Sequence, residues 1–241
     1  MTLVALALIA LIAFGTEGAI GFGGTVIAAC VGAQLFALDE LLPAFVPLNL
    51  AMSAWLLTRG RDAIAWSVLL RTIAVPVAIG AAIGLALFHI PAKTALAAVF
   101  GGFVAVLAVI QLVRPAARPL SRAWQRVFLV AGGVAHGLFG TGGPMIVYVT
   151  RRELIDKRAF RATLAVLWFV LNVALLVNFL ALGLYGRHTV ELGGVVGLAL
   201  IPGLWIGQRV HDALDGARFE RVVWTLLLVA GLALAIRSAL S

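Results

Sequence analysis

The sequence predicts an all-α polytopic membrane protein built from two related halves. Of its 241 residues, 63% are hydrophobic and only 12% are charged, and the mean hydropathy is +1.12. A chain of this composition cannot cover a soluble domain with a polar surface. One glycine phrase also occurs twice, as GAIGFGG at 18–24 and as GLFGTGG at 137–143. Such a repeat within apolar sequence is typical of membrane transporters with repeated halves.

Apolar stretches follow one another along the chain, and most approach the roughly 20 residues that a helix needs to cross a bilayer. They cover residues 3–14, 25–37, 41–57, 63–88, 94–113, 127–150, 159–184, 190–206 and 222–240. The first stretch resembles a signal-peptide core, but it lacks a preceding basic segment and belongs to the repeat. We therefore interpret it as structural.

A polar, basic and proline-containing segment, RPAARPLSRAWQR at 114–126, separates the two halves. Neither half is expected to fold alone, because repeats of this kind bury their polar groups against each other. We predict a first membrane repeat at 1–113, a basic cytoplasmic linker at 114–125 and a second membrane repeat at 126–241.

Other residues recur in the same order as the glycines. Glu17 and His136 precede the two phrases at the same offset of 119 residues. Asn49 and Asn172 lie 123 residues apart, and Pro76 and Pro202 lie 126 apart. Short insertions in loops would produce this slowly widening offset.

The distribution of Lys and Arg predicts that the second glycine segment is a re-entrant hairpin. Short cytoplasmic loops carry most of these cations. If every glycine-broken segment crossed the membrane, the two sides would hold eight and nine of them, leaving aside Arg71 within an apolar stretch. If residues 127–150 enter and leave on one side, the division becomes 14 to 3, with Lys93, Arg187 and Arg237 opposite the rest.

The symmetry of the repeats predicts a second hairpin at the first glycine segment. The alternative is that this segment crosses the membrane once as a broken helix. Each repeat then has one glycine-broken re-entrant helical hairpin and three transmembrane helices. Because the number of crossings in each half is odd, we predict that the two repeats are inverted relative to each other.

Glycine-rich breaks at membrane depth indicate a binding site. Irregular backbone is tolerated there only when it is buried in protein or lines a watery cavity, and glycine allows a ligand to approach closely. The second half-helix of each hairpin is expected to begin at Thr25 or Pro144, with its free N–H groups and positive dipole end toward the midplane. A small anion suits that geometry. The alternative is that the glycines only allow helices to pack closely.

Polar residues inside apolar segments are further candidates for functional residues, because a polar side chain in lipid has a high free-energy cost. Arg71 could pair with an anion or extend to the headgroups. Asn49 and Asn172 could donate to a ligand or bond between helices. Glu17 and His136 could carry a coupling proton, since imidazole titrates near neutral pH, or be incidental polar residues near a helix break.

The sequence contains no grouping that indicates an enzyme. Cys30 is the only cysteine, and the four histidines have no ligand spacing. No nucleophile, base and orienting residue occur together. We therefore predict no catalytic residue, no metal and no cofactor, and the lack of an ATP-binding motif favours secondary transport.

The two glycine phrases, Asn49 and KRAFRATLAVLWFVLN at 157–172 resemble the sulfite exporter TauE/SafE family of membrane permeases. The resemblance implies a sulfur-containing anionic substrate and adds Arg161 and Thr163 at the border of the site. Thr25 and Pro144 stand where the family often has a third glycine. The predicted substrate-binding residues are Gly21, Gly23, Gly24, Thr25, Asn49, Arg71, Gly140, Thr141, Gly142, Gly143, Arg161 and Asn172.

The sequence thus predicts a secondary transporter in the cell inner membrane that exports a small anion such as sulfite or an organosulfonate. The alternative is a passive anion channel or an accessory membrane subunit. Expected partners are the anion, the lipid bilayer and protons as coupling ion. The net charge of +8 requires no nucleic acid, because topology and anionic lipid account for it. The oligomeric state is left open.

Overall fold

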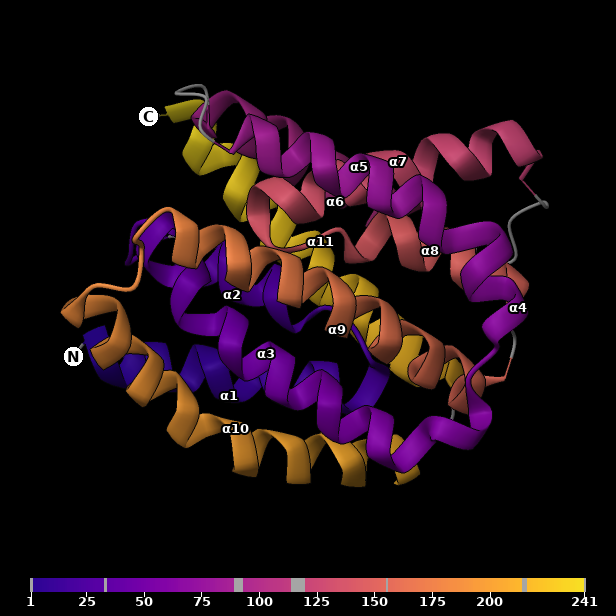
Figure 1. Cartoon of the computed structure of the whole chain (residues 1–241), viewed down its shortest axis with the longest axis horizontal. Helices are drawn as coiled ribbons and strands as arrows, with labels where there is room; N and C mark the ends of the chain where they lie inside the picture. Colours follow the sequence, from indigo (N-terminus) through magenta and orange to yellow (C-terminus); the bar gives the residue numbers. More distant parts are fainter. Residues whose placement is uncertain are drawn as a thin grey trace.

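The computed structural model of the chain contains helices and no strands in the residues that it describes, which are 2–32, 34–88, 93–113, 120–154, 156–213 and 216–240 (Figure 1). In chain order the helices are α1 (Thr2–Ile20), α2 (Gly24–Gly32), α3 (Leu38–Gly60), α4 (Trp66–Val68), α5 (Ala74–Leu87), α6 (Lys93–Val113), α7 (Arg122–Phe139), α8 (Gly143–Glu153), α9 (Lys157–Ala181), α10 (Arg187–Ala213) and α11 (Gly216–Leu240). A 3-10 helix, η1 (Arg61–Ala63), follows α3, and a π-helix, η2 (Leu69–Ile73), joins α4 to α5. The predicted all-α class is confirmed.

Five helical segments in this part of the chain are long and apolar enough to cross a membrane. They are Thr2–Ile20, Leu38–Ala63, Trp66–Leu87, Lys157–Ala181 and Arg187–Ala213. Their outer faces carry large apolar side chains, such as Leu198 and Ile201 on α10, which are 79% and 77% exposed. Such a surface suits lipid rather than water. The protein is a multi-pass membrane protein.

Each glycine phrase ends one helix and lets the next one fold back beside it. Gly21 and Gly23 have φ values of 87° and 93°, and Gly140 has a φ of 65°. Glycine adopts this left-handed region without a steric penalty. At Gly140 the backbone N–H donates to the carbonyl of His136 at 2.8 Å, which caps the C-terminal end of α7. The segments therefore form two pairs, α1 with α2 and α7 with α8.

The two outer ends of the α7–α8 pair lie together. The Gln125 amide, near the start of α7, donates to the Glu153 carboxylate at the end of α8 at 3.1 Å. The rings of Phe128 and Tyr148 stack between these helices with centroids 5.1 Å apart. The segment is therefore a hairpin in space, the geometry that the charge distribution predicts.

In each half, the first helix of the hairpin packs against a helix of the other half. Helix α1 packs against α10, and α7 packs against α5. Both contacts use glycines four residues apart, Gly203 and Gly207 against α1, and Gly80 and Gly84 against α7. The two pairs lie 123 residues apart in the sequence (203 − 80 and 207 − 84). Within each pair the glycines have the spacing of a GxxxG packing motif.

Helices α6 and α11 also meet glycine to glycine, since Gly101 and Gly231 face each other's backbone. Each half thus completes the packing of the other. The inverted orientation of the halves in the membrane and the domain boundaries stay predictions, and residues 114–119 of the linker lie outside the described residues.

The α1–α10 contact gives a stability prediction with a control on the same helix. A Cβ at Gly207 would lie 2.6 Å from the Gly15 carbonyl oxygen, whereas a Cβ at Gly194 would meet no heavy atom within 4 Å. Both changes to alanine gain the same helix propensity. Only Gly207→Ala overpacks the contact between α1 and α10, which lowers the free energy of unfolding by about 1–3 kcal/mol. Thermal unfolding of the purified variants should give a lower melting temperature for Gly207→Ala alone. Equal melting temperatures would contradict the close packing.

Candidate functional site

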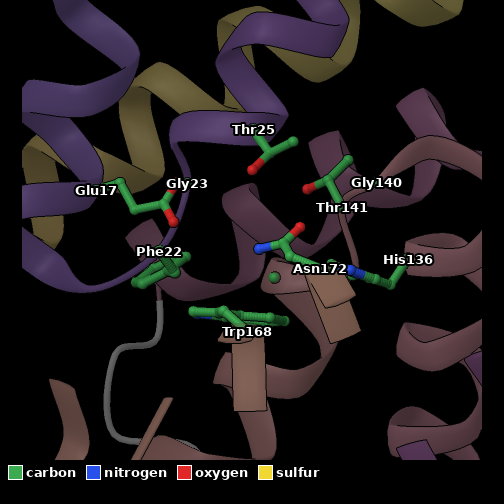
Figure 2. Close-up of a pocket in the computed structure, with 11 residues that line it drawn as sticks. Glu17, Phe22, Gly23, Thr25, His136, Gly140, Thr141, Trp168 and Asn172 are labelled. Atoms are coloured by element: carbon green, nitrogen blue, oxygen red, sulfur yellow. The ribbon is translucent and has the colours of Figure 1, made fainter. Parts of the chain in front are cut away.

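A small polar cavity, here called the central cavity, lies between the two hairpins and α9 (Figure 2). Its lining comes from both halves: Glu17, Phe22, Gly23, Thr25, His136, Gly140, Thr141, Gly142, Gly143, Trp168 and Asn172. Its volume is about 20 Å³, which is enough for one water molecule. Trp168 and Asn172 stand near the middle of the 25-residue helix α9. The cavity therefore lies at about half the depth of that span.

Helix α9 holds both hairpins at the cavity. Trp168 and Asn172 are four residues apart and so share one face of the helix. The buried Trp168 indole N–H donates to the Gly21 carbonyl at 2.7 Å. The same ring stacks on His136, with centroids 5.7 Å apart and planes 15° from parallel. One side chain thus fixes the turn of the first hairpin and the last turn of α7.

In the first hairpin a carboxylate of the chain itself occupies the start of α2. The Glu17 carboxylate accepts hydrogen bonds from the backbone N–H and the hydroxyl of Thr25. A Cβ at Gly24 would lie 2.6 Å from Glu17 Oε2, so only glycine leaves room for this contact. Thr25 Oγ1 in turn accepts from the Asn49 amide at 3.2 Å. The positive end of α2 already has its negative partner.

The second hairpin lacks such a carboxylate. His136 stands at the position equivalent to Glu17, and no side chain caps the helix at Gly142. His136 is 3% exposed, and among the described residues neither of its ring nitrogens has a hydrogen-bond partner. The Asn172 side-chain oxygen is buried and unpartnered in the same part of the structure. Buried polar groups without partners are uncommon and invite explanation by a ligand or water.

Figure 2 shows how these groups are placed around the space. Thr25, Thr141 and Asn172 point into it, while Glu17 and His136 stand on opposite sides and Trp168 lies beneath. The two halves are thus not equivalent at the site. Phe22 occupies the place of Thr141 in the first repeat (141 − 22 = 119).

The structure brings most of the predicted site residues to this cavity. Those on its lining are Glu17, Gly23, Thr25, His136, Gly140, Thr141, Gly142, Gly143 and Asn172. Gly21, Gly24 and Asn49 lie just behind the lining, where they contact Trp168, Glu17 and Thr25 respectively.

Arg71 is not among the residues at the cavity. It lies on the π-helix η2 and its side chain is exposed. This position suits the alternative interpretation, in which the long side chain extends toward the headgroups.

Arg161 and Thr163 lie near the start of α9, away from the central cavity. Arg161 donates to the Gly18 carbonyl at 3.1 Å and to the Gln208 side-chain oxygen at 3.3 Å. Thr163 is fully buried and its hydroxyl accepts from the Ala65 backbone N–H at 2.9 Å. Thr163 therefore joins α9 to the segment after η1.

Sequence reasoning missed Phe22 and Trp168, which form the aromatic walls of the cavity. Trp168 offered a signal, because an indole N–H in the middle of an apolar span needs a partner. Phe22 offered none, since its position within the glycine phrase resembles an ordinary apolar filler.

The described residues contain no group of three or more His, Cys, Asp or Glu side chains placed to hold a metal ion. The expected absence of metals and cofactors stays a prediction.

Comparison with known proteins identifies the family. A sequence model of the sulfite exporter TauE/SafE family matches residues 6–234, nearly the whole chain. The chain belongs to the TauE/SafE family. This is a family of membrane transporters and not a class of enzymes, and the resemblance seen in the glycine phrases is confirmed. Neither the curated proteins nor the solved structures include a significant match to this TauE/SafE protein.

Proposed function

We propose that this TauE/SafE protein is a secondary transporter that exports a small sulfur-containing anion, such as sulfite or an organosulfonate, across the cell inner membrane. The observation that carries the proposal is the second hairpin. There an uncapped helix start faces His136 and Asn172, two buried polar side chains with unpartnered atoms among the described residues.

The groups around this helix start suit an oxyanion. The Thr141 hydroxyl, the Asn172 amide, a ring N–H of His136 and the backbone N–H of Gly143 can each donate a hydrogen bond. Bonds from such donors to an ionised oxygen are stronger than bonds between neutral groups. The positive end of α8 adds to the attraction. The walls of Phe22 and Trp168 accommodate the apolar part of an organosulfonate.

The central cavity is too small for the substrate in this conformation. With a volume of about 20 Å³, it has room for one water molecule but not for a sulfur oxyanion. Binding and release therefore require the two hairpins to separate. We propose that they do so alternately toward the two sides, as inverted repeats allow.

Glu17 makes this export sensitive to protons. Its carboxylate lines the same small cavity as the anion site, and two negative charges at such distances repel strongly away from water. Protonation of Glu17 or His136 removes that repulsion or adds an attractive charge. We therefore propose that a proton is the coupling ion, with the anion gradient and the membrane potential as alternative driving forces.

The alternative, a passive anion channel or an accessory subunit, lacks a supporting observation of equal weight. A channel needs a continuous path wide enough for the anion, whereas the central cavity has a volume of only about 20 Å³. The remaining partners stay as predicted, with the lipid bilayer around the apolar faces and no nucleic acid.

Counterflow in proteoliposomes tests the proposal. Vesicles preloaded with unlabelled sulfite should transiently accumulate labelled sulfite, because a carrier exchanges substrate across the membrane. Thiosulfate and sulfoacetate should compete, whereas acetate should not. Flux without counterflow would favour the channel, and a failure of every sulfur anion to compete would overturn the anion site.

A further inference from the structure

A second cavity, larger than the first, lies where α3, α9 and α10 meet. Its volume is about 370 Å³. Four cations, Arg59, Lys157, Arg158 and Arg161, line it together with His211 and Asp212. We call it the basic vestibule.

Two side chains that line the basic vestibule contact the end of α1, next to the turn of the first hairpin. Arg161 donates to the carbonyl of Gly18, and His211 Nδ1 contacts the carbonyl of Ala19 at 2.7 Å. Both carbonyls belong to the last turn of α1. The next residues of the same turn, Phe22 and Gly23, line the central cavity.

Helix α9 connects the two cavities. Arg161 lines the basic vestibule and Trp168 lines the central cavity. Seven residues separate them, which corresponds to about 10 Å along a helix. Phe22, which lines the central cavity, meets the ring of Phe160 edge to face, with centroids 6.3 Å apart. Because Phe160 is the neighbour of Arg161 in the chain, this contact joins the lining of the central cavity to the part of α9 at the basic vestibule.

The charge of the basic vestibule is unbalanced. Arg158 pairs with Asp62 at 2.7 Å, and Asp212 accepts from the Gln208 amide. Among the described residues, Arg59, Lys157 and Arg161 form no ion pair with a carboxylate. A concave surface with an excess of one charge concentrates ions of the opposite sign, and arginine matches the geometry of oxyanions.

We propose that the basic vestibule is a separate entry site that binds the sulfur oxyanion before it reaches the central cavity. Arg59 and Lys157 attract the anion, and Arg161 binds it. Arg161 holds the Gly18 carbonyl through Nη1, and its remaining N–H groups can donate to an oxyanion. The bound anion thus lies beside the last turn of α1, which leads into the glycine turn at the central cavity. This inference rests on the proposed transport function.

Transport kinetics in inverted membrane vesicles test the entry site. In the double variant Arg59→Gln/Lys157→Gln, we expect the KM for sulfite to rise about tenfold at low salt with the maximal rate unchanged, because electrostatic capture weakens. High salt should reduce the difference from the wild type. The matched control is Arg122→Gln/Arg126→Gln, which removes the same charge from exposed positions outside the vestibule and should leave KM unchanged. Equal KM values for both double variants would overturn the entry site while leaving the transport function intact.

Calorimetric titration of the purified protein with sulfite separates the two proposals. The entry site predicts a binding event that survives Asn172→Ala and is about tenfold weaker in Arg59→Gln/Lys157→Gln. If binding is unchanged in the double variant and disappears in Asn172→Ala, the basic vestibule binds no anion. If the wild type binds sulfite at the vestibule but shows no counterflow, the entry site stands and the proposed transport fails.

Discussion

Replacement of Gly142 by alanine is expected to abolish transport and to lower stability severely. A Cβ at this position would overlap the backbone carbonyl of Gly132 on α7. Backbone atoms within a packed helix cannot move aside as the end of a flexible side chain can. We expect a cost of about 3 kcal/mol in the free energy of unfolding, measured by thermal unfolding, together with the loss of sulfite counterflow.

The adjacent glycine provides the control. A Cβ at Gly143 would lie 3.5 Å from the Phe22 ring, an ordinary van der Waals distance. Gly143→Ala should therefore melt close to the wild type, while its methyl group at the cavity lining weakens the apparent affinity for sulfite. If Gly142→Ala melts like Gly143→Ala, the hairpin does not close as described.

Replacement of Glu17 by glutamine is expected to remove the response of transport to a pH gradient. Glutamine keeps the shape and an acceptor for Thr25 but cannot exchange a proton. The groups that face the Glu17 side chain are Thr25 on α2 and, across the central cavity, His136 on α7. Arg161 on α9 and His211 on α10 contact the last carbonyls of α1. Exchange of the anion down its own gradient should persist.

The measurement is efflux of a sulfonate with and without an imposed pH gradient. A sulfonate is preferred to sulfite because it remains ionised across the tested range. His136→Gln should reduce the pH response as well, whereas Glu191→Gln, at an exposed carboxylate that pairs with Arg187, should keep it. An unchanged response in Glu17→Gln would exclude this carboxylate as the proton carrier.

The sequence predicted the helical class and the two glycine hairpins because both follow from local properties. Apolar length predicts spans, and the phrase at 137–143 together with the flanking cations predicts a chain reversal. The exchange of partners between halves was not predicted. Gly80 and Gly84 resemble many other small residues in apolar sequence, and only packing against α7 distinguishes them.

The site was predicted in part for a similar reason. Asn49 and Asn172 hold equivalent positions in the repeat, but Asn49 is engaged by Thr25, whereas Asn172 faces the cavity. The difference arises from Thr25, whose hydroxyl accepts from Asn49, whereas its counterpart Pro144 has no hydroxyl. Arg71 lies in an apolar segment without clear helical periodicity, so its sequence position could not indicate which way its side chain faces.

The affinity for sulfite in variants of α9 tests whether the anion binds between the two glycine phrases. Asn172→Ala removes a polar group from the central cavity, whereas Asn178→Ala removes a similar group six residues further along the helix and outside the cavity. Loss of a hydrogen bond to a charged group costs about 1.5–3 kcal/mol, so the dissociation constant for the central site should rise about tenfold or more in Asn172→Ala. Asn178→Ala should bind like the wild type. Equal affinities in the two variants would contradict a central anion site.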